Sequence, residues 1–394
     1  MSRPVSSVAL LGSEDMSRRL VIMTKQGSFK RAVRRHAERT GQRYTEARAD
    51  LELAETQAFV HDRPFEHESL TAHLEARYGI RITSLASIDD DPNTRPRDSW
   101  PGHYPATLLV KRADGPPWIA RIFSSPADQV SRVEGDAEIL RFLAAHDFPA
   151  ERVAHEEPVS VYDGSGVIVT EFVEGGRPDG SSIQRELGSL LGRLHSLPSG
   201  EGAVARAGGS DESGGGRHVG RPKEDLAAAM SFLVSVEDSV GSGGRESFEW
   251  LRDRVENADD GEGLPEAFTH GNYHAWSAVG TPGDLVIVGW AGSGRGPRLP
   301  ALAWLLTTAA ESDLALVDEV VRGYSEHVQL TADEIDRLPQ VLDIKPLWLG
   351  CIEYRQAVRS GSTPTLAAGW PAWAADRTER NEHIAARAVA ALRS

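Results

Sequence analysis

The stretch AFTHGNYHAWSAVGTPGDLVIVGWAGSGRGPRLPALAWLL, which runs from Ala267 to Leu306, decides the fold expected for this chain. Its pattern predicts a loop and a short strand, a turn, a second strand, a Gly-rich loop and an apolar helix. The turn letters Pro-Gly-Asp between two apolar runs indicate a hairpin. We therefore expect a hairpin that leads through a Gly-rich loop into an apolar helix.

The composition limits the kind of protein. The 394 residues suffice for two or three lobes with a substantial core. Cys351 is the single cysteine, so an intramolecular disulfide is excluded and a reducing compartment is expected. No apolar run approaches the length of a membrane span, and acidic residues interrupt the short apolar patch near the N-terminus. We expect a cytoplasmic protein without a membrane partner.

Charge is distributed unevenly along the chain. The formal net charge is −15, yet the segment Lys25–Arg48 carries eight Lys or Arg against two acids. Residues 29–39, with Ser28 as N-cap, and residues 46–60 are predicted helices, and the pair resembles a helix-turn-helix in outline. A solvated charged face explains this helical arm better, because a charge run alone carries little specificity. Nucleic-acid binding through Lys25–Arg48 stays open as an alternative.

Residues 77–175 are predicted to form a small lobe rich in strands. The strands are expected at Ile82–Ile88, Ala106–Arg112, Trp118–Phe123, Val159–Tyr162 and Gly166–Phe172. A helix at about residues 127–145 separates the third strand from the fourth. Residues 1–76 form an N-terminal extension in this division of the chain, and a helix predicted at 70–77 ends at its boundary.

Residues 176–394 are predicted to form a larger, mainly helical lobe. Helices are expected at 183–197, 223–238, 246–258, 299–310, 313–328 and 331–344, and onwards to the region of residue 392. Residues 201–220 are rich in Gly and acids, which predicts a flexible insertion.

These elements and motifs resemble the aminoglycoside phosphotransferase (APH/choline kinase-like) family, which has a protein-kinase-like fold. The family pattern is His-Gly-Asp, Asn five residues after the Asp, then Asp-Trp-Glu and a Gly-Arg-Gly-Asp-Pro loop. The corresponding positions here hold His270-Gly271-Asn272, Ser277, Gly289-Trp290-Ala291 and Gly294-Arg295-Gly296. Leu194-His195 is similar to the end of the family's Gly-Arg-Leu-His helix. The resemblance implies a bilobal α+β fold in a degenerate member, which keeps the frame and has lost the carboxylates.

Nucleotide binding in such a fold needs a cation on the third strand, usually a Lys paired with a helix carboxylate. Arg121 stands at that position and can bind phosphate through two parallel hydrogen bonds. Glu138 is its expected helix partner, with Glu134 and Asp136 as register alternatives. A plain Arg-Glu bridge between strand and helix explains the pair equally well. The remaining implied cofactor positions lie in the hinge, at Glu171 and Val173.

The catalytic positions are altered. Asn272 stands where the family has its catalytic Asp, and an amide cannot accept a proton at ordinary pH. His270 belongs to the same motif, and the first His of this motif is more often structural. His274 is an alternative base if it reaches the acceptor, although a structural role is again more frequent.

The implied metal positions are altered as well. Ser277 replaces the metal-binding Asn, and Gly289, which offers no side chain, replaces the metal-binding Asp. Mg²⁺ prefers carboxylate oxygens, so binding of Mg²⁺ and ATP is expected to be weakened. Tyr273 and Trp276 add aromatic rings nearby, for which core filling is favoured over ligand stacking.

Three hypotheses for the function follow. The favoured one is a protein of this family that has lost kinase catalysis and binds a small molecule or a protein partner, as a pseudokinase does. An active ATP-dependent phosphotransferase for a small hydroxylated molecule, such as an antibiotic, is the alternative. The third is a regulator that binds nucleic acid through Lys25–Arg48.

Overall fold

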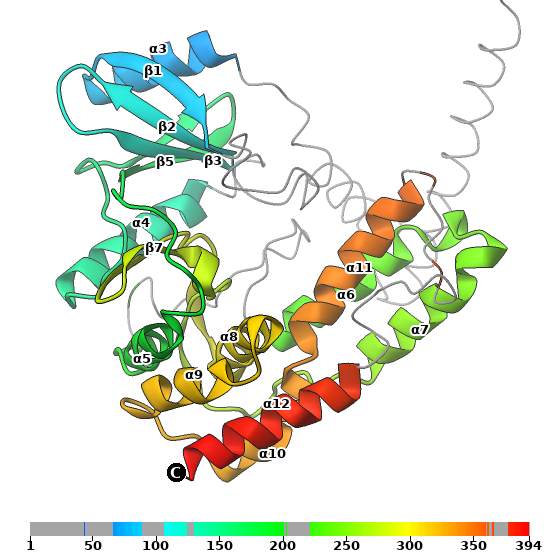
Figure 1. The fold of residues 1–394 in the computed structure, drawn as a ribbon. Helices are drawn as coiled ribbons and strands as arrows, with labels where there is room; N and C mark the ends of the chain where they lie inside the picture. Colours follow the sequence, from blue (N-terminus) through cyan, green and yellow to red (C-terminus); the bar gives the residue numbers. More distant parts are fainter. Residues whose placement is uncertain are drawn as a thin grey trace, which may run out of the picture.

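The computed structural model describes residues 66–88, 106–123, 130–200, 221–359 and 377–393, with isolated positions at 43, 202, 361 and 365. These residues form a small lobe with a β-sheet and a larger, mainly helical lobe, drawn above and below each other in Figure 1. The predicted arm Lys25–Arg48 lies outside the described ranges except for Arg43, and the predicted insertion lies outside them except for Gly202.

The small lobe is a five-stranded antiparallel sheet with one helix on each face. The strand order is β1-β2-β3-β5-β4, and the helices are α3 and α4. Their bounds are α3 His67–Tyr78, β1 Ile82–Ser87, β2 Ala106–Arg112, β3 Trp118–Phe123, α4 Val130–Ala145, β4 Val159–Tyr162 and β5 Ser165–Glu171. All five predicted strands are confirmed, with bounds that differ by at most one residue.

The two-residue period of β3 decides where its side chains point. Ala120 and Ile122 lie in the core that α3 covers, together with Leu70 of that helix. Phe123 belongs instead to the core shared with α4 and the large lobe. Arg121 alternates with Ala120 and Ile122, so the strand directs its guanidinium toward the large lobe.

The large lobe contains helices and two short two-stranded sheets, one of which is a hairpin. Its elements up to the end of this hairpin are α5 Gln184–His195, α6 Pro222–Val234, η4 Glu237–Ser239, η5 Ser242–Gly244, α7 Arg245–Glu256, β6 Glu266–Thr269, η6 Ala275–Ser277, β7 Ala278–Thr281 and β8 Asp284–Ile287. The remainder are β9 Gly294–Pro297, α8 Leu299–Ser312, α9 Leu316–Ser325, α10 Ala332–Val341, α11 Ile344–Arg359 and α12 Arg377–Leu392. Strand β6 pairs with β9, and β7 pairs with β8.

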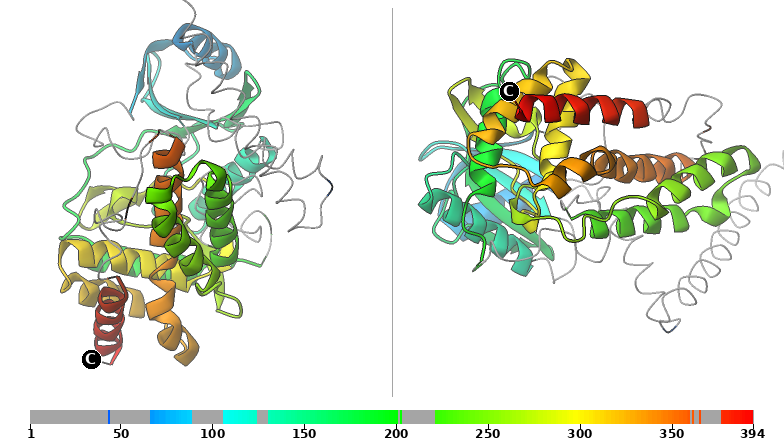
Figure 2. Two further views of the ribbon diagram at one scale, coloured as in Figure 1. Left: turned by 90° about the vertical axis from the view of Figure 1, so that its right-hand side faces the viewer. Right: turned by 90° about the horizontal axis from the view of Figure 1, so that it is seen from below.

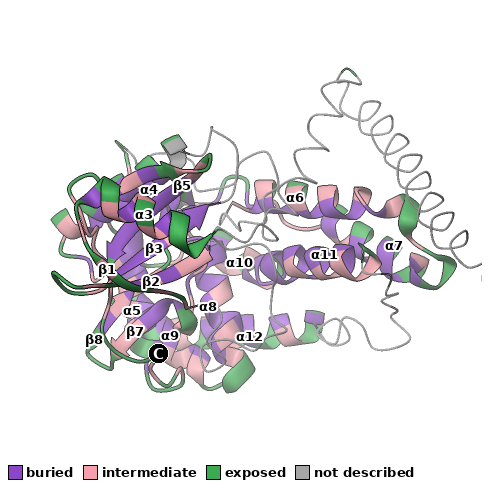
Figure 3. Ribbon diagram, turned by 90° about the horizontal axis from the view of Figure 1, so that it is seen from above, coloured by how far each residue is buried: buried purple, intermediate pink, exposed green. Residues whose placement is uncertain are grey.

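Two apolar cores divide this lobe. The larger one surrounds α5, α8 and α9 and continues under the sheet to α4. The other joins α6, α7 and α11, which extend away from the rest of the lobe in the right view of Figure 2. Figure 3 shows buried residues along the facing sides of α6 and α11. No helix in the described part of the chain is long and apolar enough to span a membrane.

A short segment after β5 connects the lobes and is fixed to the β7–β8 hairpin. The backbone N–H of Gly280 donates to the carbonyl of Gly176 at 3.0 Å. Gly280 has φ +122°, and a Cβ there would lie 2.3 Å from the carbonyl oxygen of Asp284. Glycine is therefore needed at position 280 by the hairpin itself, and a Cβ on Gly175 of the hinge would lie 3.1 Å from the Gly280 Cα.

The Leu194-His195 helix α5 packs closely against α9. The His195 ring is buried, and its Nδ1 lies 2.9 Å from the Tyr324 hydroxyl. Burial lowers the pKa of His195 to about 3, so the ring is neutral at ordinary pH. At Gly323, a Cβ would lie 2.0 Å from the carbonyl oxygen of Arg185.

This contact yields a prediction for stability. Gly323→Ala should lower the free energy of unfolding by about 1–3 kcal/mol, because the methyl group forces α5 and α9 apart and outweighs the better helix propensity of alanine. Urea denaturation measures the change. Gly241→Ala is the matched control, since no atom lies within 4 Å of the added Cβ. Equal stability of the two variants would contradict the close α5–α9 packing.

Candidate functional site

The 267–306 stretch belongs to the large lobe, and its residues 287–289 lie at the junction with the small lobe. Strand β6 leads into the loop His270–His274, η6 begins the β7–β8 hairpin, and residues after β8 carry Gly289 and Trp290 toward β9. Trp290 is buried, with its ring 4.7 Å from that of His270. The predicted hairpin and the apolar helix after it are confirmed, whereas residues 267–269 and 294–296, predicted as loops, lie in the paired strands β6 and β9. Hydrogen bonds from the Ser277 hydroxyl to the Asn272 carbonyl and from the Val288 N–H to the Ser277 carbonyl bring the three altered positions together.

His270 is a structural residue in this arrangement. Its Nδ1 accepts a hydrogen bond from the backbone N–H of Asn272 at 3.1 Å, so the proton resides on Nε2, which donates to the Val288 carbonyl at 3.2 Å. Burial lowers the pKa of His270 to about 4. The ring thus holds the loop to the strand of the hairpin and is unsuited to proton transfer.

His274 has a similar role at the start of η6. Its Nδ1 accepts a hydrogen bond from the backbone N–H of Trp276 at 3.2 Å and caps this short helix. Burial, and secondarily the charge of Lys345, lowers the pKa of His274 to about 3. A base this weak does not replace the missing carboxylate at neutral pH.

Asn272 contacts a residue that sequence reasoning missed. Its side-chain oxygen accepts a hydrogen bond from Nζ of Lys345 at 2.9 Å, and Lys345 also donates to the Gly271 carbonyl at 3.3 Å. Lys345 lies in the first turn of α11 and is buried. A single Lys within the apolar run Ile344 to Trp348 was the signal in the sequence that could have indicated a buried amine.

The two predicted metal positions offer little to a cation. The Ser277 hydroxyl donates to the Asn272 carbonyl at 2.6 Å. Gly289 adopts φ +86°, and its backbone N–H donates a hydrogen bond to Glu151 Oε1 at 2.8 Å. Within the described ranges, no group of three His, Cys, Asp or Glu side chains could hold a metal ion. The donor set therefore does not fit Mg²⁺.

Arg121 has a different partner from the one predicted. Its Nη1 donates to Glu151 Oε2 at 2.7 Å and to the Thr170 hydroxyl at 3.3 Å. The predicted Arg121–Glu138 pair is wrong, because the turn of α4 leaves Glu138 exposed. Its register alternatives fail too: Glu134 is exposed, and Asp136 is buried where its Oδ1 accepts from the Gly292 backbone N–H at 3.4 Å.

Backbone contacts fix the position of Glu151. The residue follows α4 and donates its N–H to the Ile287 carbonyl at 3.1 Å, while Ile287 donates to the Pro149 carbonyl at 2.8 Å. This short bridge to β8 sets the carboxylate beneath the sheet. Its Oε2 also accepts from the Thr170 hydroxyl at 3.0 Å. One buried carboxylate thus contacts β3, β5 and the Gly289 backbone.

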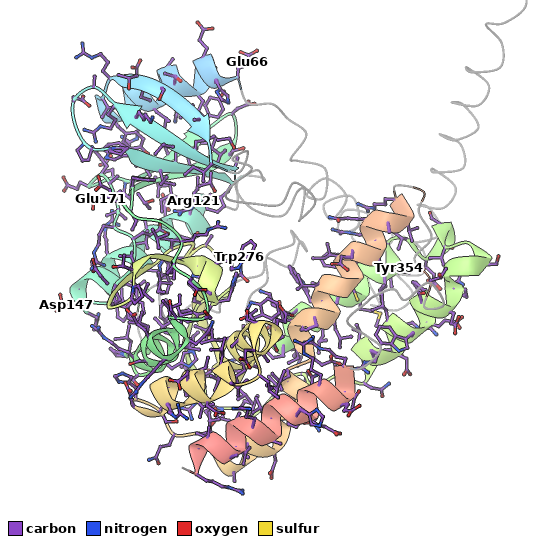
Figure 4. All side chains as sticks on the ribbon, viewed as in Figure 1. Glu66, Arg121, Asp147, Glu171, Trp276 and Tyr354 are labelled. Carbon is purple, nitrogen blue, oxygen red and sulfur yellow. The ribbon has the colours of Figure 1, made fainter. Side chains whose placement is uncertain are left out.

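The hinge residues lie at the edge of this site. Glu171 ends β5 and is exposed, and its backbone N–H donates to the Arg152 carbonyl at 2.8 Å. Val173 lies two residues after Glu171 and is half-buried. Figure 4 shows Glu171 and Arg121 near the lower edge of the sheet, above the large lobe. Their cofactor-binding role stays a prediction.

The two aromatic residues of the loop differ in burial. Tyr273 is buried in the main core and its hydroxyl donates to the Leu187 carbonyl at 3.1 Å, as core filling requires. Trp276 is 54% exposed, and the guanidinium of Arg177 lies 5.2 Å from its ring centroid. Core filling is therefore wrong for Trp276, which projects from the loop in Figure 4.

The Glu151 contacts generate a prediction. Glu151→Gln should lower the free energy of unfolding by about 3 kcal/mol, because it leaves the charge of Arg121 unpaired in a site with little solvent. Chemical denaturation measures this loss. Glu138→Gln is the matched control and should change stability by less than about 0.5 kcal/mol. A larger effect of Glu138→Gln than of Glu151→Gln would refute the assignment of the ion pair.

Several solved structures are similar to this chain. Amicoumacin kinase hAmiN, in complex with AMP-PNP, Ca²⁺ and Ami, is 12% identical, with a TM-score of 0.51 over 82% of this chain and 96% of its own. Aminoglycoside phosphotransferase APH(3'')-Id from Streptomyces rimosus, in complex with ADP and streptomycin, is 18% identical over 72% and 99%, with a TM-score of 0.45. Choline kinase LicA from Streptococcus pneumoniae is 13% identical over 83% and 98%, with a TM-score of 0.46.

The likeness to hAmiN shows the fold alone, a bilobal kinase-like α+β fold. No curated protein sequence matches the chain. The family model described as the phosphotransferase enzyme family, APH, matches residues 100–337, which is more than half of the chain. On this match and the arrangement of its two lobes, the chain belongs to the APH phosphotransferase enzyme family.

Proposed function

We propose that this chain is a phosphotransferase-family protein that has lost kinase catalysis and acts by binding a small molecule or a protein partner. The main observation behind the proposal is that Glu151 contacts two of the altered positions at once. Its carboxylate pairs with Arg121, the cation expected to hold phosphates, and accepts from Gly289, the position expected to hold the metal. Both positions that are expected to contact the nucleotide are thereby bound to the same carboxylate.

The catalytic position supports the same proposal. Base catalysis is worth on the order of 10²–10⁴ in rate, and Asn272 cannot supply it. Its amide oxygen already accepts from Lys345. His270 and His274 have pKa values of about 4 and about 3, so neither side chain replaces the base effectively. Loss of the base would slow proton removal from the acceptor, and loss of the metal ligands would weaken binding of Mg²⁺.

The alternative is an active phosphotransferase on a small hydroxylated molecule such as an antibiotic. In support of this alternative, the family contains enzymes, and the similar proteins are named as kinases of amicoumacin, aminoglycosides and choline. No contact among the described residues favours it over binding alone. Nucleic-acid binding through Lys25–Arg48 and a cytoplasmic location stay predictions.

Thermal melting tests the proposal. Addition of ATP with Mg²⁺ should raise the melting temperature no more than ATP with EDTA, because the site lacks metal ligands. A site whose Kd lies a hundredfold below the nucleotide concentration would add about 2.7 kcal/mol of stability, which melting detects. Mg²⁺ alone is the control for nonspecific effects. A rise that requires both Mg²⁺ and ATP, or phosphorylation of an aminoglycoside or macrolide, would overturn the proposal.

A further inference from the structure

The Lys345 amine lies in an unusual place for a lysine. The residue is 5% exposed, and its Nζ lies 5.2 Å from the ring centroid of Trp304 and 5.8 Å from that of Trp348. Its two hydrogen-bond acceptors, Asn272 Oδ1 and the Gly271 carbonyl, are both neutral oxygens. No carboxylate in the described part of the chain forms an ion pair with it.

This environment favours the neutral amine. Burial lowers the pKa of Lys345 to about 7, and the opposing charge of Asp225 on α6 is the weaker influence. From the loop, His274 faces the amine as a neutral ring, because its own pKa is about 3. A substantial fraction of Lys345 is therefore unprotonated at neutral pH, against on the order of one amine in 10³ for an exposed lysine.

The hydrogen bonds leave the reactive electrons free. A neutral amine has two N–H groups and one lone pair, and the two acceptors match the two N–H groups. A desolvated lysine whose lone pair is free is a nucleophile for carbonyl carbon. The substitution of Asp by Asn at position 272 fits this state, because a carboxylate would hold the amine as ammonium.

One aromatic ring, that of Trp304, lies beside the amine, and a second, that of Trp276, lies in the loop that carries Asn272. The indole Nε1 of Trp304 is buried and has no acceptor among the described residues, although part of this side chain reaches the surface. Trp276, from the same loop as Asn272, presents its exposed ring on the side of α8 and α11 in Figure 4. A ligand with a flat apolar body and a carbonyl oxygen would suit these groups.

We propose that Lys345 binds an aromatic or apolar aldehyde covalently, as an imine, with the Trp304 N–H donating to the oxygen of the addition intermediate. The lone pair of Nζ forms a bond to the carbonyl carbon, the C=O π electrons move to oxygen, and a proton passes from nitrogen to that oxygen. Loss of water from this carbinolamine then gives the C=N bond. The step requires neither metal nor oxidant, and it specifies a ligand class for the proposed binding function, on which it rests.

Reductive trapping tests this. The full-length protein is incubated with 4-nitrobenzaldehyde, reduced with borohydride and mapped by peptide mass spectrometry. At pH 7 the label on Lys345 should exceed that on Lys223, whose side chain is 71% exposed, at least tenfold. The labelling rate should rise with pH with a midpoint near 7, because only the unprotonated amine reacts. Equal labelling of both lysines, or a midpoint near 10, would overturn the proposal.

Three variants separate the proposed roles. Lys345→Arg should abolish the label at this peptide. Asn272→Asp should move the midpoint to higher pH, because its carboxylate stabilises the ammonium form. Trp304→Phe, which keeps an aromatic side chain and removes the N–H, should slow labelling severalfold at an unchanged midpoint. An unaltered midpoint in a folded Asn272→Asp protein counts against the argument, and a melting curve of each variant establishes folding.

No nucleotide enters this experiment. Its failure alongside Mg²⁺-independent melting would leave the proposed binding function intact. Mg²⁺-dependent ATP binding alongside specific labelling would overturn only the loss of catalysis.

Discussion

The carboxylate of Glu151 is the contact on which the geometry between the lobes depends. A buried charge costs several kcal/mol unless it is paired and hydrogen-bonded, and here Arg121, Thr170 and the Gly289 backbone provide those partners. The same contacts join β3 and β5 to the loop after β8. Once the carboxylate takes this place, a phosphate group must compete with it for Arg121, and the loop at Gly289 presents a donor where a cation needs an acceptor. One side chain thus joins the two lobes, and the proposed loss of nucleotide binding rests on the same contacts.

The second constraint is the neutral pair formed by Asn272 and Lys345. An amide is the residue that accepts from a buried amine without stabilising its charge, so the two side chains suit each other. On the proposed function, the amide at position 272 and the buried lysine of α11 belong to the same change in the chemistry of this site. Around them, hydrogen bonds within the chain hold His270 to Val288 and Ser277 to Asn272.

Local patterns predicted most of the fold, whereas the partners of the buried charges could not be predicted from them. Alternation in β3 and the turn after β7 were sufficient for strands, and they placed Arg121 correctly. Spacing along α4 offered Glu138 as its partner, yet burial of the neighbouring Ile139 and Leu140 turns Glu138 outward. Glu151 follows the helix, where only the long-range bridge to β8 brings it beneath the sheet. Such pairing depends on tertiary contacts that no local period encodes.

Hydrogen exchange at the Gly289 backbone N–H tests most directly whether Glu151 has taken the place of the metal-bound nucleotide. Mass spectrometry of the peptide that contains Gly289 should show a protected amide in the wild-type protein, and ATP with Mg²⁺ should leave its exchange rate unchanged. The protection should be lost in Glu151→Ala while amides of α9 remain protected. Rapid exchange in the wild-type protein, or slowing of the exchange by ATP with Mg²⁺, would contradict this account.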